Sequence, residues 1–447
     1  MDNVINLKRG LDLKLAGGLP DDAEIRHIEA DAVAVTPDDF PGFVPKLEVK
    51  EGDTVACGSP LLRDKIQEQV KLVSPIDGVV ERVVRGDRRK IIRVEVRRSA
   101  EPVARDAVKV ADNAEAILAA IAQAGLLAMM RQRPYDIVPR VDIRPRDIFV
   151  TAFDSAPLAP SLERMVADRA EDIECGVRAL AKLTDGHIYI STRKDSQIAV
   201  PTEAVHYIVN GPHPAGNAGV QAANIAPVNK GEVIWTLDIV TLARVGKLVR
   251  TGEADWDVNV AVTGSEVETG YIAATQAGAA IAPILSGNVK ADGRHHRIIA
   301  GNVLTGVAVD PEGYLHYPYR QITVIPEGDD ADEFMGWASM RPGKMSVNRS
   351  FPSRFIPGKR FAPDARLLGG RRAMIMSGVY DDMFPMDILP EYLLKAILSK
   401  DIDKMEALGI YEVAPEDFAL CEYADPSKIE IQKAVRDGLD YLRKELE

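Results

Sequence analysis

Two short stretches of the 447-residue chain carry side chains that could bind a polar ligand. His213 lies in a glycine- and proline-rich loop, residues 211–219, where its imidazole could donate a hydrogen bond to a carbonyl group or to an anion. Arg131 and Arg133 lie two residues apart, and their guanidinium groups could form an anion site. The competing interpretations are structural, with His213 bonding to backbone and the arginines solvated or salt-bridged. No catalytic residue is predicted in this chain.

A metal site is not predicted. His295 and His296 are adjacent, and adjacent residues of a strand point to opposite faces, so both imidazoles cannot reach one ion without irregular backbone. Acidic runs at residues 21–24 and 327–333 lack the spacing of a calcium loop and are expected to be solvated turns. The three cysteines, Cys57, Cys175 and Cys421, are far apart, which argues against a disulfide framework and favours a reducing compartment.

Composition indicates a globular protein with 27% charged and 46% hydrophobic residues, and the length predicts roughly two to four domains. The net charge of -12 argues against nucleic-acid binding by the whole surface. The first ten residues lack the apolar run of a signal peptide, and polar residues and a proline interrupt the apolar stretch 271–289. We therefore expect a cytosolic protein without a transmembrane segment, whose membrane contact is peripheral or through a partner.

Residues 1–100 are predicted to form a first β domain. Two turn-punctuated β segments, VKEGDTVACGSPLL at residues 49–62 and SPIDGVVERV at residues 74–83, echo each other. Their spacing resembles the barrel-sandwich fold of lipoyl and biotinyl carrier domains. Asp64-Lys65 matches the carrier dipeptide whose lysine is modified, although the run from Lys65 to the second segment is longer than in a carrier. Modification of Lys65 in a carrier module is thus an alternative hypothesis. The competing interpretation is that Lys65 is an ordinary, unmodified loop lysine.

The rest of the chain is predicted to contain three further regions. Residues 101–255 alternate helical patterns (113–130 and 161–183) with strand patterns (147–152 and 187–191), which is typical of an α/β domain. Residues 256–328 combine short strands, glycine-rich turns and one helix-like segment in a small α+β module. Residues 329–447 comprise a connecting arm and a helical region with short amphipathic helices at 390–398, 402–408 and 429–447.

The arm is strongly basic, whereas the chain as a whole is acidic. Residues 341–372 hold nine basic residues against one acid, Asp364, with three phenylalanines between them. Such a segment would suit an acidic partner protein or an anionic lipid surface, and the alternative is packing on the protein's own acidic surface. No nucleic-acid-binding fold accompanies it, so nucleic acid is not expected as a partner.

Several blocks in a constant order resemble one family, the A subunits of the Na⁺-translocating NADH:quinone oxidoreductase. These blocks include KRGLDL at residues 8–13, RQRPYD at 131–136, GPHPAG at 211–216, MDILP at 386–390 and EDFALC at 416–421. The resemblance implies an SLBB-like, ubiquitin-like module at 256–328. It also implies a peripheral subunit on the cytoplasmic side of a bacterial inner membrane that contacts a membrane-embedded subunit. The complex passes electrons from NADH to quinone and exports Na⁺, and His213, Arg131 and Arg133 become candidates for a quinone or anion site.

The resemblance extends to the flavin-carrying subunits of complex I and of the Rnf complex, and this chain lacks two of their features. A flavin phosphate needs a glycine-rich loop, whereas residues 124–134 read AGLLAMMRQRP, with one glycine among bulky side chains. An iron-sulfur cluster needs four thiolates, and Cys421 stands alone. We therefore expect no cofactor in this subunit, with flavins and iron-sulfur centres in other subunits. A soluble flavin dehydrogenase is the second alternative.

Overall fold

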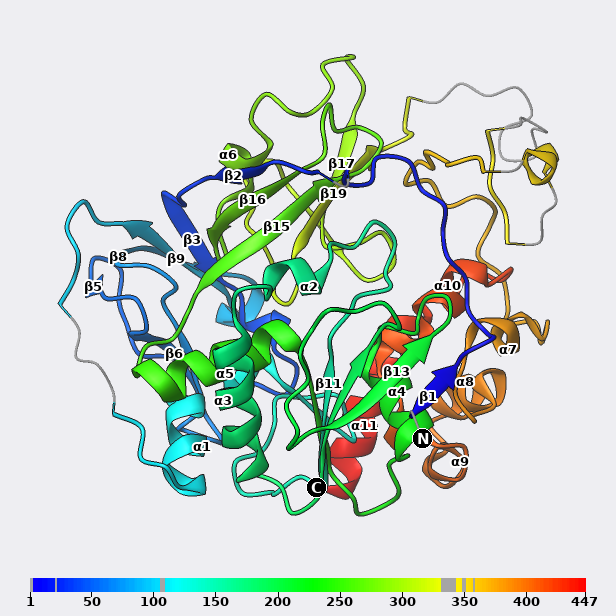
Figure 1. Cartoon of the computed structure of the whole chain (residues 1–447). Helices are drawn as coiled ribbons and strands as arrows, with labels where there is room; N and C mark the ends of the chain where they lie inside the picture. Colours follow the sequence, from blue (N-terminus) through cyan, green and yellow to red (C-terminus); the bar gives the residue numbers. More distant parts are fainter. Residues whose placement is uncertain (1–2, 21, 105–108, 331–342, 348–350, 357) are drawn as a thin grey trace.

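The computed structural model describes the chain except residues 1–2, 21, 105–108, 331–342, 348–350 and 357. The other regions surround a central α/β domain (Figure 1). The barrel-sandwich domain lies on one side of it, the C-terminal helices on the other, and a third domain above. The contacts between these regions determine which side chains surround His213, Arg131 and Arg133.

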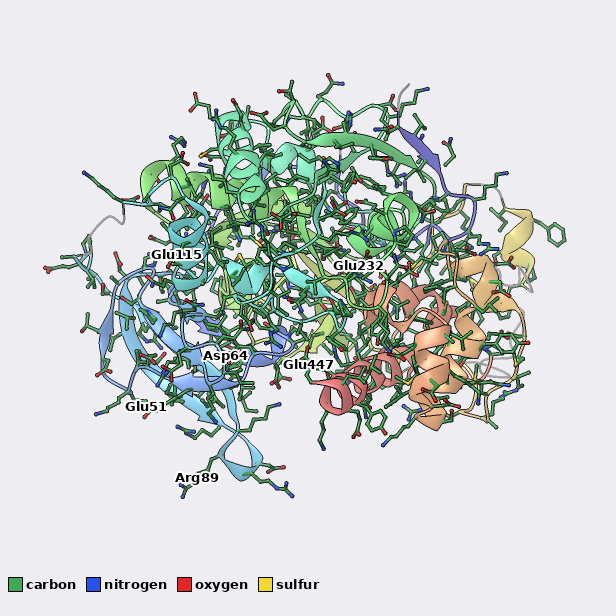
Figure 2. All side chains as sticks on the ribbon, turned by 90° about the horizontal axis from the view of Figure 1, so that it is seen from below. Glu51, Asp64, Arg89, Glu115, Glu232 and Glu447 are labelled. Carbon is green, nitrogen blue, oxygen red and sulfur yellow. The ribbon has the colours of Figure 1, made fainter. Side chains whose placement is uncertain are left out.

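The barrel-sandwich domain consists of two small antiparallel sheets with β-branched residues facing inward. One sheet has the order β3-β9-β8-β5 and the other β4-β6-β7. The strands are β3 (Ala32–Val35), β4 (Pro45–Leu47), β5 (Thr54–Val55), β6 (Pro60–Asp64), β7 (Lys71–Val73), β8 (Gly78–Arg85) and β9 (Ile91–Arg98). A single turn, η1 (Pro37–Asp39), follows β3, and η2 (Asp87–Arg89) closes the β8–β9 hairpin, which projects from the body with Arg89 at its tip (Figure 2).

The α/β domain has a six-stranded sheet of order β1-β13-β12-β11-β14-β10, in which β1 spans Val4–Asn6 and all strands are parallel except β10. Its strands are β10 (Arg131–Arg133), β11 (Asp147–Thr151), β12 (Ile188–Thr192), β13 (Val205–Asn210) and β14 (Ile234–Asp238). Its helices are α1 (Ala114–Gln123), η3 (Leu127–Met129), α2 (Leu162–Met165), α3 (Ala170–Ala181), α4 (Ala218–Ile225) and α5 (Ile239–Thr251). Every residue of β11 is buried, as expected for a central parallel strand.

Two helix predictions in this domain need correction. The pattern over residues 113–130 predicts one helix, but α1 ends at Gln123 and Gly125 adopts a φ of 78°, a conformation that glycine tolerates and that stops a helix. The pattern over 161–183 also predicts one helix, but α2 and α3 are separated at residues 166–169. This break lets Arg169 pair with Asp172 at 3.1 Å and with Asp255 at 3.0 Å.

The third domain has a mixed sheet of order β18-β17-β19-β15-β16-β2, in which β2 spans Ile25–His27. Its elements are β15 (Asp257–Thr263), β16 (Tyr271–Gln276), α6 (Ile281–Leu285), β17 (His296–Ala300), β18 (Val307–Val309) and β19 (Gln321–Pro326). The helical region contains α7 (Val379–Met383), α8 (Pro390–Ser399), α9 (Ile402–Ala407), η6 (Ile410–Glu412), η7 (Pro415–Phe418), α10 (Ala419–Ala424) and α11 (Ile431–Leu446), and the arm holds η5 (Pro352–Phe355). The helical region has its own apolar core.

Two strands near the start of the chain join the sheets of other domains. Strand β1 (Val4–Asn6) pairs in parallel with β13 of the α/β sheet, and β2 (Ile25–His27) pairs in parallel with β16 of the third domain. The sequence pattern predicts that this opening belongs to the first β domain at residues 1–100. Instead it completes the edges of two distant sheets, because each edge strand offers free backbone groups that an extended segment can satisfy.

Candidate functional site

A cavity of about 440 Å³ lies where the central parallel strands of the α/β domain end. In its sheet β11 stands between β12 and β14, and ligands of open α/β sheets bind beyond the carboxyl ends of such parallel strands. Thr151 ends β11 and Asp238 ends β14, and both line the cavity. The volume falls within the range of small-molecule sites.

All four regions of the chain contribute walls. Asp39 comes from the barrel-sandwich domain, Arg131 from the α/β domain, Tyr319 from the third domain and Glu416 from the helical region. Because these residues are far apart in the sequence, only the packing of the domains brings them together. Of the three predicted residues, His213 and Arg131 line the cavity and Arg133 does not.

His213 is a neutral, buried imidazole with an unused nitrogen. Its Nδ1 lies 3.0 Å from Ser155 Oγ, which accepts a hydrogen bond from Gly216 N at 2.8 Å. The Ser155 hydroxyl can donate to Nδ1, and in that tautomer the ring proton lies on Nε2. Burial lowers the pKa of His213 to about 4, so the ring is uncharged at neutral pH. Nε2 has no partner among the described residues and remains a buried donor.

Arg131 is held by backbone carbonyls. Its guanidinium donates to Ala128 O and Asp39 O, each at 2.9 Å, and lies 5.6 Å from the centre of the Tyr317 ring. Among the described residues it forms no salt bridge, so its charge is available to an anionic or carbonyl ligand in the cavity.

Arg133 is a structural residue between two domains. Its side chain is 2% exposed, and Nη1 lies 2.9 Å from Asp417 Oδ2 and also donates to Glu412 O. A Cβ at Gly219 would lie 1.9 Å from Arg133 Nη2, so the guanidinium fills the space that this glycine leaves at the start of α4. The two arginines therefore do not form one anion site, and Arg133 joins the α/β domain to the helical region.

The cavity also contains an ion pair that the sequence did not predict. Arg320 of the third domain binds Asp238 of the α/β domain in a bidentate fashion, with N–O distances of 2.7 and 3.1 Å. Burial opposes the charge on Asp238, but Arg320 outweighs it and lowers the pKa of this carboxyl. Asp154, which follows β11, lines the same cavity, and burial raises its pKa. The one available signal was Asp154, which follows the strand predicted at residues 147–152.

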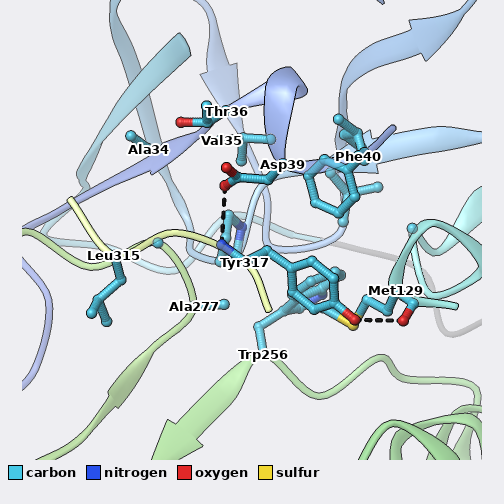
Figure 3. Close-up of a pocket in the computed structure, with 15 residues that line it drawn as sticks. Ala34, Val35, Thr36, Asp39, Phe40, Met129, Trp256, Ala277, Leu315 and Tyr317 are labelled. Carbon is cyan, nitrogen blue, oxygen red and sulfur yellow. Dashed lines mark hydrogen bonds between the residues drawn. The ribbon is translucent and has the colours of Figure 1, made fainter. Parts of the chain in front are cut away.

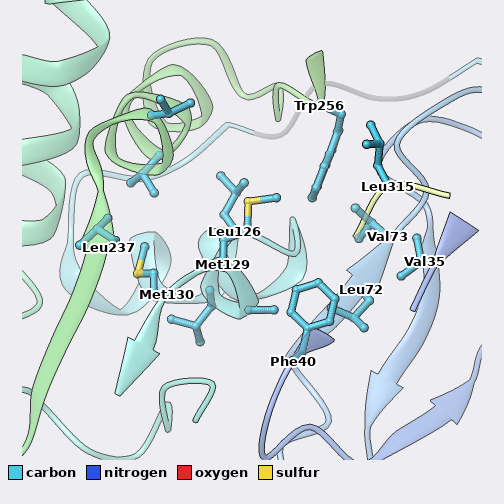
Figure 4. Packing of buried hydrophobic residues seen from close by; sticks show 14 of the residues in the cluster. Val35, Phe40, Leu72, Val73, Leu126, Met129, Met130, Leu237, Trp256 and Leu315 are labelled. Atoms are coloured by element: carbon cyan, nitrogen blue, oxygen red, sulfur yellow. The ribbon is translucent and has the colours of Figure 1, made fainter. Parts of the chain in front are cut away.

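Residues 126–130, where a flavin-binding relative would need a glycine-rich loop, are packed into the common core. Leu126, Leu127, Ala128 and Met130 have no exposed surface and Met129 is 5% exposed. Figure 4 shows Leu126 and Met129 among Phe40, Leu72 and Trp256, which come from neighbouring parts of the chain. The side chains of this segment therefore belong to the core that the domains share.

A small apolar pocket of about 50 Å³ marks the junction of three domains (Figure 3). Phe40 stacks on Tyr317 with ring centres 5.2 Å apart. Asp39 accepts a hydrogen bond from Tyr317 N at 3.0 Å and lies 2.8 Å from His316 Nδ1, while Tyr317 OH donates to Met129 O at 2.5 Å. These contacts fix the barrel-sandwich and third domains against the α/β domain and so hold the cavity walls in place.

Lys65 lies on the exposed turn after β6. Two residues later, the Gln67 side chain accepts from Val141 N at 2.8 Å and donates to Pro139 O at 3.5 Å. A carrier lysine needs a hairpin tip that can travel between sites, whereas this turn is attached to the α/β domain. The geometry is that of a structural turn.

The lone cysteine of the helical region is inert. Cys421 is fully buried in α10, and burial raises the pKa of its thiol far above the ordinary value. Cys57 and Cys175 lie in other domains and are partly exposed.

The arm partly contacts the rest of the chain. Arg371 pairs with Glu430 at 2.6 Å, Arg360 donates to Leu15 O at 3.4 Å, and Arg366 pairs with Asp364 within the arm at 2.5 Å. Arg341 and Arg349 lie outside the described residues.

An apolar surface lies beyond the arm. Ile375, Met376, Leu389 and Tyr392 are 40–55% exposed. They flank Glu391, which accepts from Ser377 N at 3.0 Å and from Gly378 N at 2.8 Å, so the segment before α7 is held against the start of α8.

None of the helices in the described part of the chain is both long and apolar enough to cross a bilayer.

Comparison with known proteins gives matches along most of the chain. Residues 5–99 match the NqrA N-terminal barrel-sandwich hybrid domain, residues 112–254 the NqrA second alpha/beta domain, and residues 259–310 the NQRA C-terminal domain of SLBB type. These matches confirm the predicted barrel-sandwich, α/β and SLBB-like domains.

Full-length relatives share one description, the A subunit of the Na(+)-translocating NADH-quinone reductase. That of Rhodopirellula baltica is 33% identical over 99% of both chains, and that of Neisseria meningitidis serogroup C is 34% identical over 99% of this chain and 100% of its own. Among solved structures, an NAD⁺-reducing [NiFe]-hydrogenase in the H₂-reduced state is 12% identical, with a TM-score of 0.40 over 74% of this chain and 61% of that chain. The last likeness is too weak to assign a fold.

Proposed function

Because the chain belongs to the family of A subunits of the Na⁺-translocating NADH-quinone reductase, we propose that it acts as a peripheral subunit with no prosthetic group of its own. Its relatives are named as subunits of an enzyme that reduces quinone with NADH and translocates Na⁺. The chain supports the same reaction as part of the complex, while other subunits hold the flavins and iron-sulfur centres.

The observation that carries this proposal is the packing of residues 126–130 into the core, together with the single buried cysteine of the helical region. The absorbance spectrum of the purified full chain tests it. We expect no flavin or iron-sulfur bands. A stoichiometric yellow or brown chromophore would overturn the proposal and would favour a flavin dehydrogenase instead. Intact mass spectrometry tests the carrier alternative, because modification of Lys65 would add a lipoyl or biotinyl mass.

We further propose that the cavity receives the head group of a quinone. A quinone carbonyl accepts hydrogen bonds, and the cavity offers as donors His213 Nε2 and the guanidinium of Arg131, which forms no salt bridge within the described part of the chain. A photoreactive quinone should label residues of the cavity wall in the wild-type chain. His213→Asn should reduce labelling several-fold, whereas His187→Asn, an exposed histidine outside the cavity lining, should not. Equal labelling of the two variants would show that the quinone does not bind in this cavity.

The proposed partner is a membrane-embedded subunit, met on the cytoplasmic side of the inner membrane. The apolar surface of Ile375, Met376, Leu389 and Tyr392 next to the basic arm supports this proposal, because exposed apolar side chains rimmed by charge are typical of docking surfaces. A photocrosslinker at Tyr392 in the assembled complex should capture a membrane subunit, and one at Glu115 on α1 should not. Capture from Glu115 alone would place the interface elsewhere.

A further inference from the structure

A histidine and two carboxylates meet in the third domain, away from the cavity. Glu266 lies in the turn after β15, Asp292 in the loop before β17, and His296 is the first residue of β17. One possible ligand atom from each lies within 4.8 Å of the others. The two loops are joined by backbone, since Lys290 N donates to Glu266 O at 3.0 Å.

The hydrogen bonding of His296 fixes which ring nitrogen is available. Nε2 lies 3.1 Å from Lys290 O, and a carbonyl oxygen can only accept, so Nε2 carries the proton. In the neutral ring Nδ1 then holds a lone pair, and this buried atom has no hydrogen-bond partner among the described residues. Histidines that ligate metals show this arrangement, in which the other ring nitrogen donates to a carbonyl or carboxylate.

Glu266 presents the complementary charge. Its side chain is 7% exposed, and among the described residues no lysine or arginine lies within 4.0 Å of it, the imidazole of His296 being the one basic group found there. Ser265 Oγ donates to its Oε1 at 3.1 Å. A buried carboxylate with so little compensation is costly unless a cation meets it.

The separation of the two groups suits an ion between them. Glu266 Oε2 and His296 Nδ1 are 3.6 Å apart, which is too far for a hydrogen bond. Two ligands that bind one zinc ion at tetrahedral angles lie about 3.4 Å from each other. The observed distance between Glu266 Oε2 and His296 Nδ1 is therefore close to the ligand–ligand distance around a zinc ion, and a small movement of either side chain would match it.

We propose that Glu266, His296 and Asp292 bind a divalent cation of the zinc class. His296 Nδ1 and a Glu266 oxygen are the buried ligands, and the more exposed Asp292 closes the site from the solvent side by rotation of its side chain. Three protein ligands of this kind leave a fourth position for solvent. The ion would join the loop of residues 286–295 to the turn after β15. This proposal is independent of the proposed function.

The basic side chains near the site are engaged by other groups and do not occupy the position of the ion. Arg294 Nε lies 3.6 Å from Asp292 Oδ2, and Asp292 Oδ1 lies 3.4 Å from His296 Nε2. Asp292 therefore has to leave the Nε2 side of the ring by side-chain rotation before it can reach an ion at Nδ1. The ammonium of Lys290 is engaged by Ser265 O at 2.5 Å. His295, the other histidine of the pair, points to Asp329 at 2.8 Å. The two adjacent histidines therefore face different partners, as the sequence analysis predicts for neighbouring residues of a strand.

Cobalt binding to the full chain tests the proposal. The protein is prepared without a polyhistidine tag, stripped with EDTA and titrated with Co²⁺, whose ligand-field bands report a protein site and whose thiolate charge-transfer bands report cysteine. The variants are Glu266→Gln and His296→Asn, with His295→Asn as the matched control. Circular dichroism checks that each variant is folded. If His296→Asn does not fold, Glu266→Gln alone decides the outcome.

We expect the wild-type chain and His295→Asn to bind a single Co²⁺ that Zn²⁺ displaces, with no thiolate band. Each of the other two variants should bind at least about 10-fold more weakly, because it loses one of the buried ligands. Zn²⁺ should also raise the Tm of the wild-type chain and of His295→Asn only. No saturable binding by the wild-type chain, equal affinity of the variants, or a thiolate band would each overturn the proposal.

Discussion

At the scale of single residues, the chain buries charge where two domains meet. Arg133 and Asp417 pair between the α/β domain and the helical region, and Asp238 and Arg320 pair between the α/β and third domains. A buried ion pair contributes little net stability, but removing one member leaves the other charge buried alone. These pairs therefore act mainly to specify how the domains are arranged.

Arg133→Met should lower the free energy of unfolding by about 3–5 kcal/mol, because it leaves Asp417 buried without its partner. Denaturant unfolding of the full chain measures this change. The double variant Arg133→Met, Asp417→Leu removes both charges and should recover a large part of the loss. A single variant that costs less than about 1 kcal/mol would contradict the interpretation of Arg133 as an interdomain residue.

His213 should make stability depend on pH. Its pKa is lowered from 6.5 to about 4 by burial, so between these values the unfolded chain binds a proton that the folded chain excludes. The free energy of unfolding contributed by His213 is therefore complete above pH 6.5 and falls by about 3 kcal/mol as the pH drops to about 4.

The measurement is denaturant unfolding at several pH values for the wild-type chain and for His213→Gln, with His187→Gln as an exposed control. His213→Gln should flatten the curve in this window, and the control should keep the wild-type slope. An unchanged slope in His213→Gln would mean that folding does not shift the pKa of His213.

At the scale of elements, the helices α3 and α5 are in close contact because two glycines face their partners. A Cβ at Gly246 would lie 1.7 Å from Asp172 O, and a Cβ at Gly176 would lie 2.5 Å from Leu242 O. These glycines let the backbones approach and hold α5 against α3. Since α5 begins directly after Asp238, the same packing positions the cavity's aspartate.

Gly246→Ala should therefore destabilise the protein, by about 1–3 kcal/mol or more. In an exposed helix the same change would stabilise by about 1 kcal/mol through helix propensity, so the sign of the effect identifies the cause. Thermal unfolding compares it with Gly370→Ala, where a Cβ would meet nothing within 4 Å. A Tm at or above that of the wild-type chain would show that α3 and α5 can separate without loss.

At the scale of the whole molecule, the N-terminal segment connects the domains. Strand β1 completes the α/β sheet and β2 completes the sheet of the third domain, before the barrel-sandwich begins at β3. The arm touches the same segment, since Phe361 N donates to Lys14 O at 2.8 Å. The domains are therefore interlaced, and the cavity between them depends on segments far apart in the chain.

A chain that lacks residues 1–28 should unfold at a lower temperature, because two sheet edges lose their outer strands. Limited proteolysis should cut first near β13 and β16, which these strands cover. Adding residues 1–28 as a separate peptide should restore part of the protection. A truncated chain with an unchanged Tm would show that β1 and β2 only rest on the sheets.

The local pattern of the sequence determined the kind of structure that each segment adopts. Buried strand patterns predicted β11 and β12, and amphipathic periodicity predicted α8, α9 and α11. The absence of a glycine-rich loop and of a cysteine cluster was likewise visible in the residues themselves. These properties depend on neighbours in the chain, so periodicity and composition record them.

Only the tertiary structure decided what lies against each buried face. Arg131 and Arg133 belong to the same short strand, yet one lines a cavity and the other is enclosed, because different domains cover them. The pairing of Asp238 with Arg320, and the meeting of Glu266 with His296, join residues 82 and 30 positions apart. Periodicity marks a face as buried, but the partner that covers it is set by packing between distant segments.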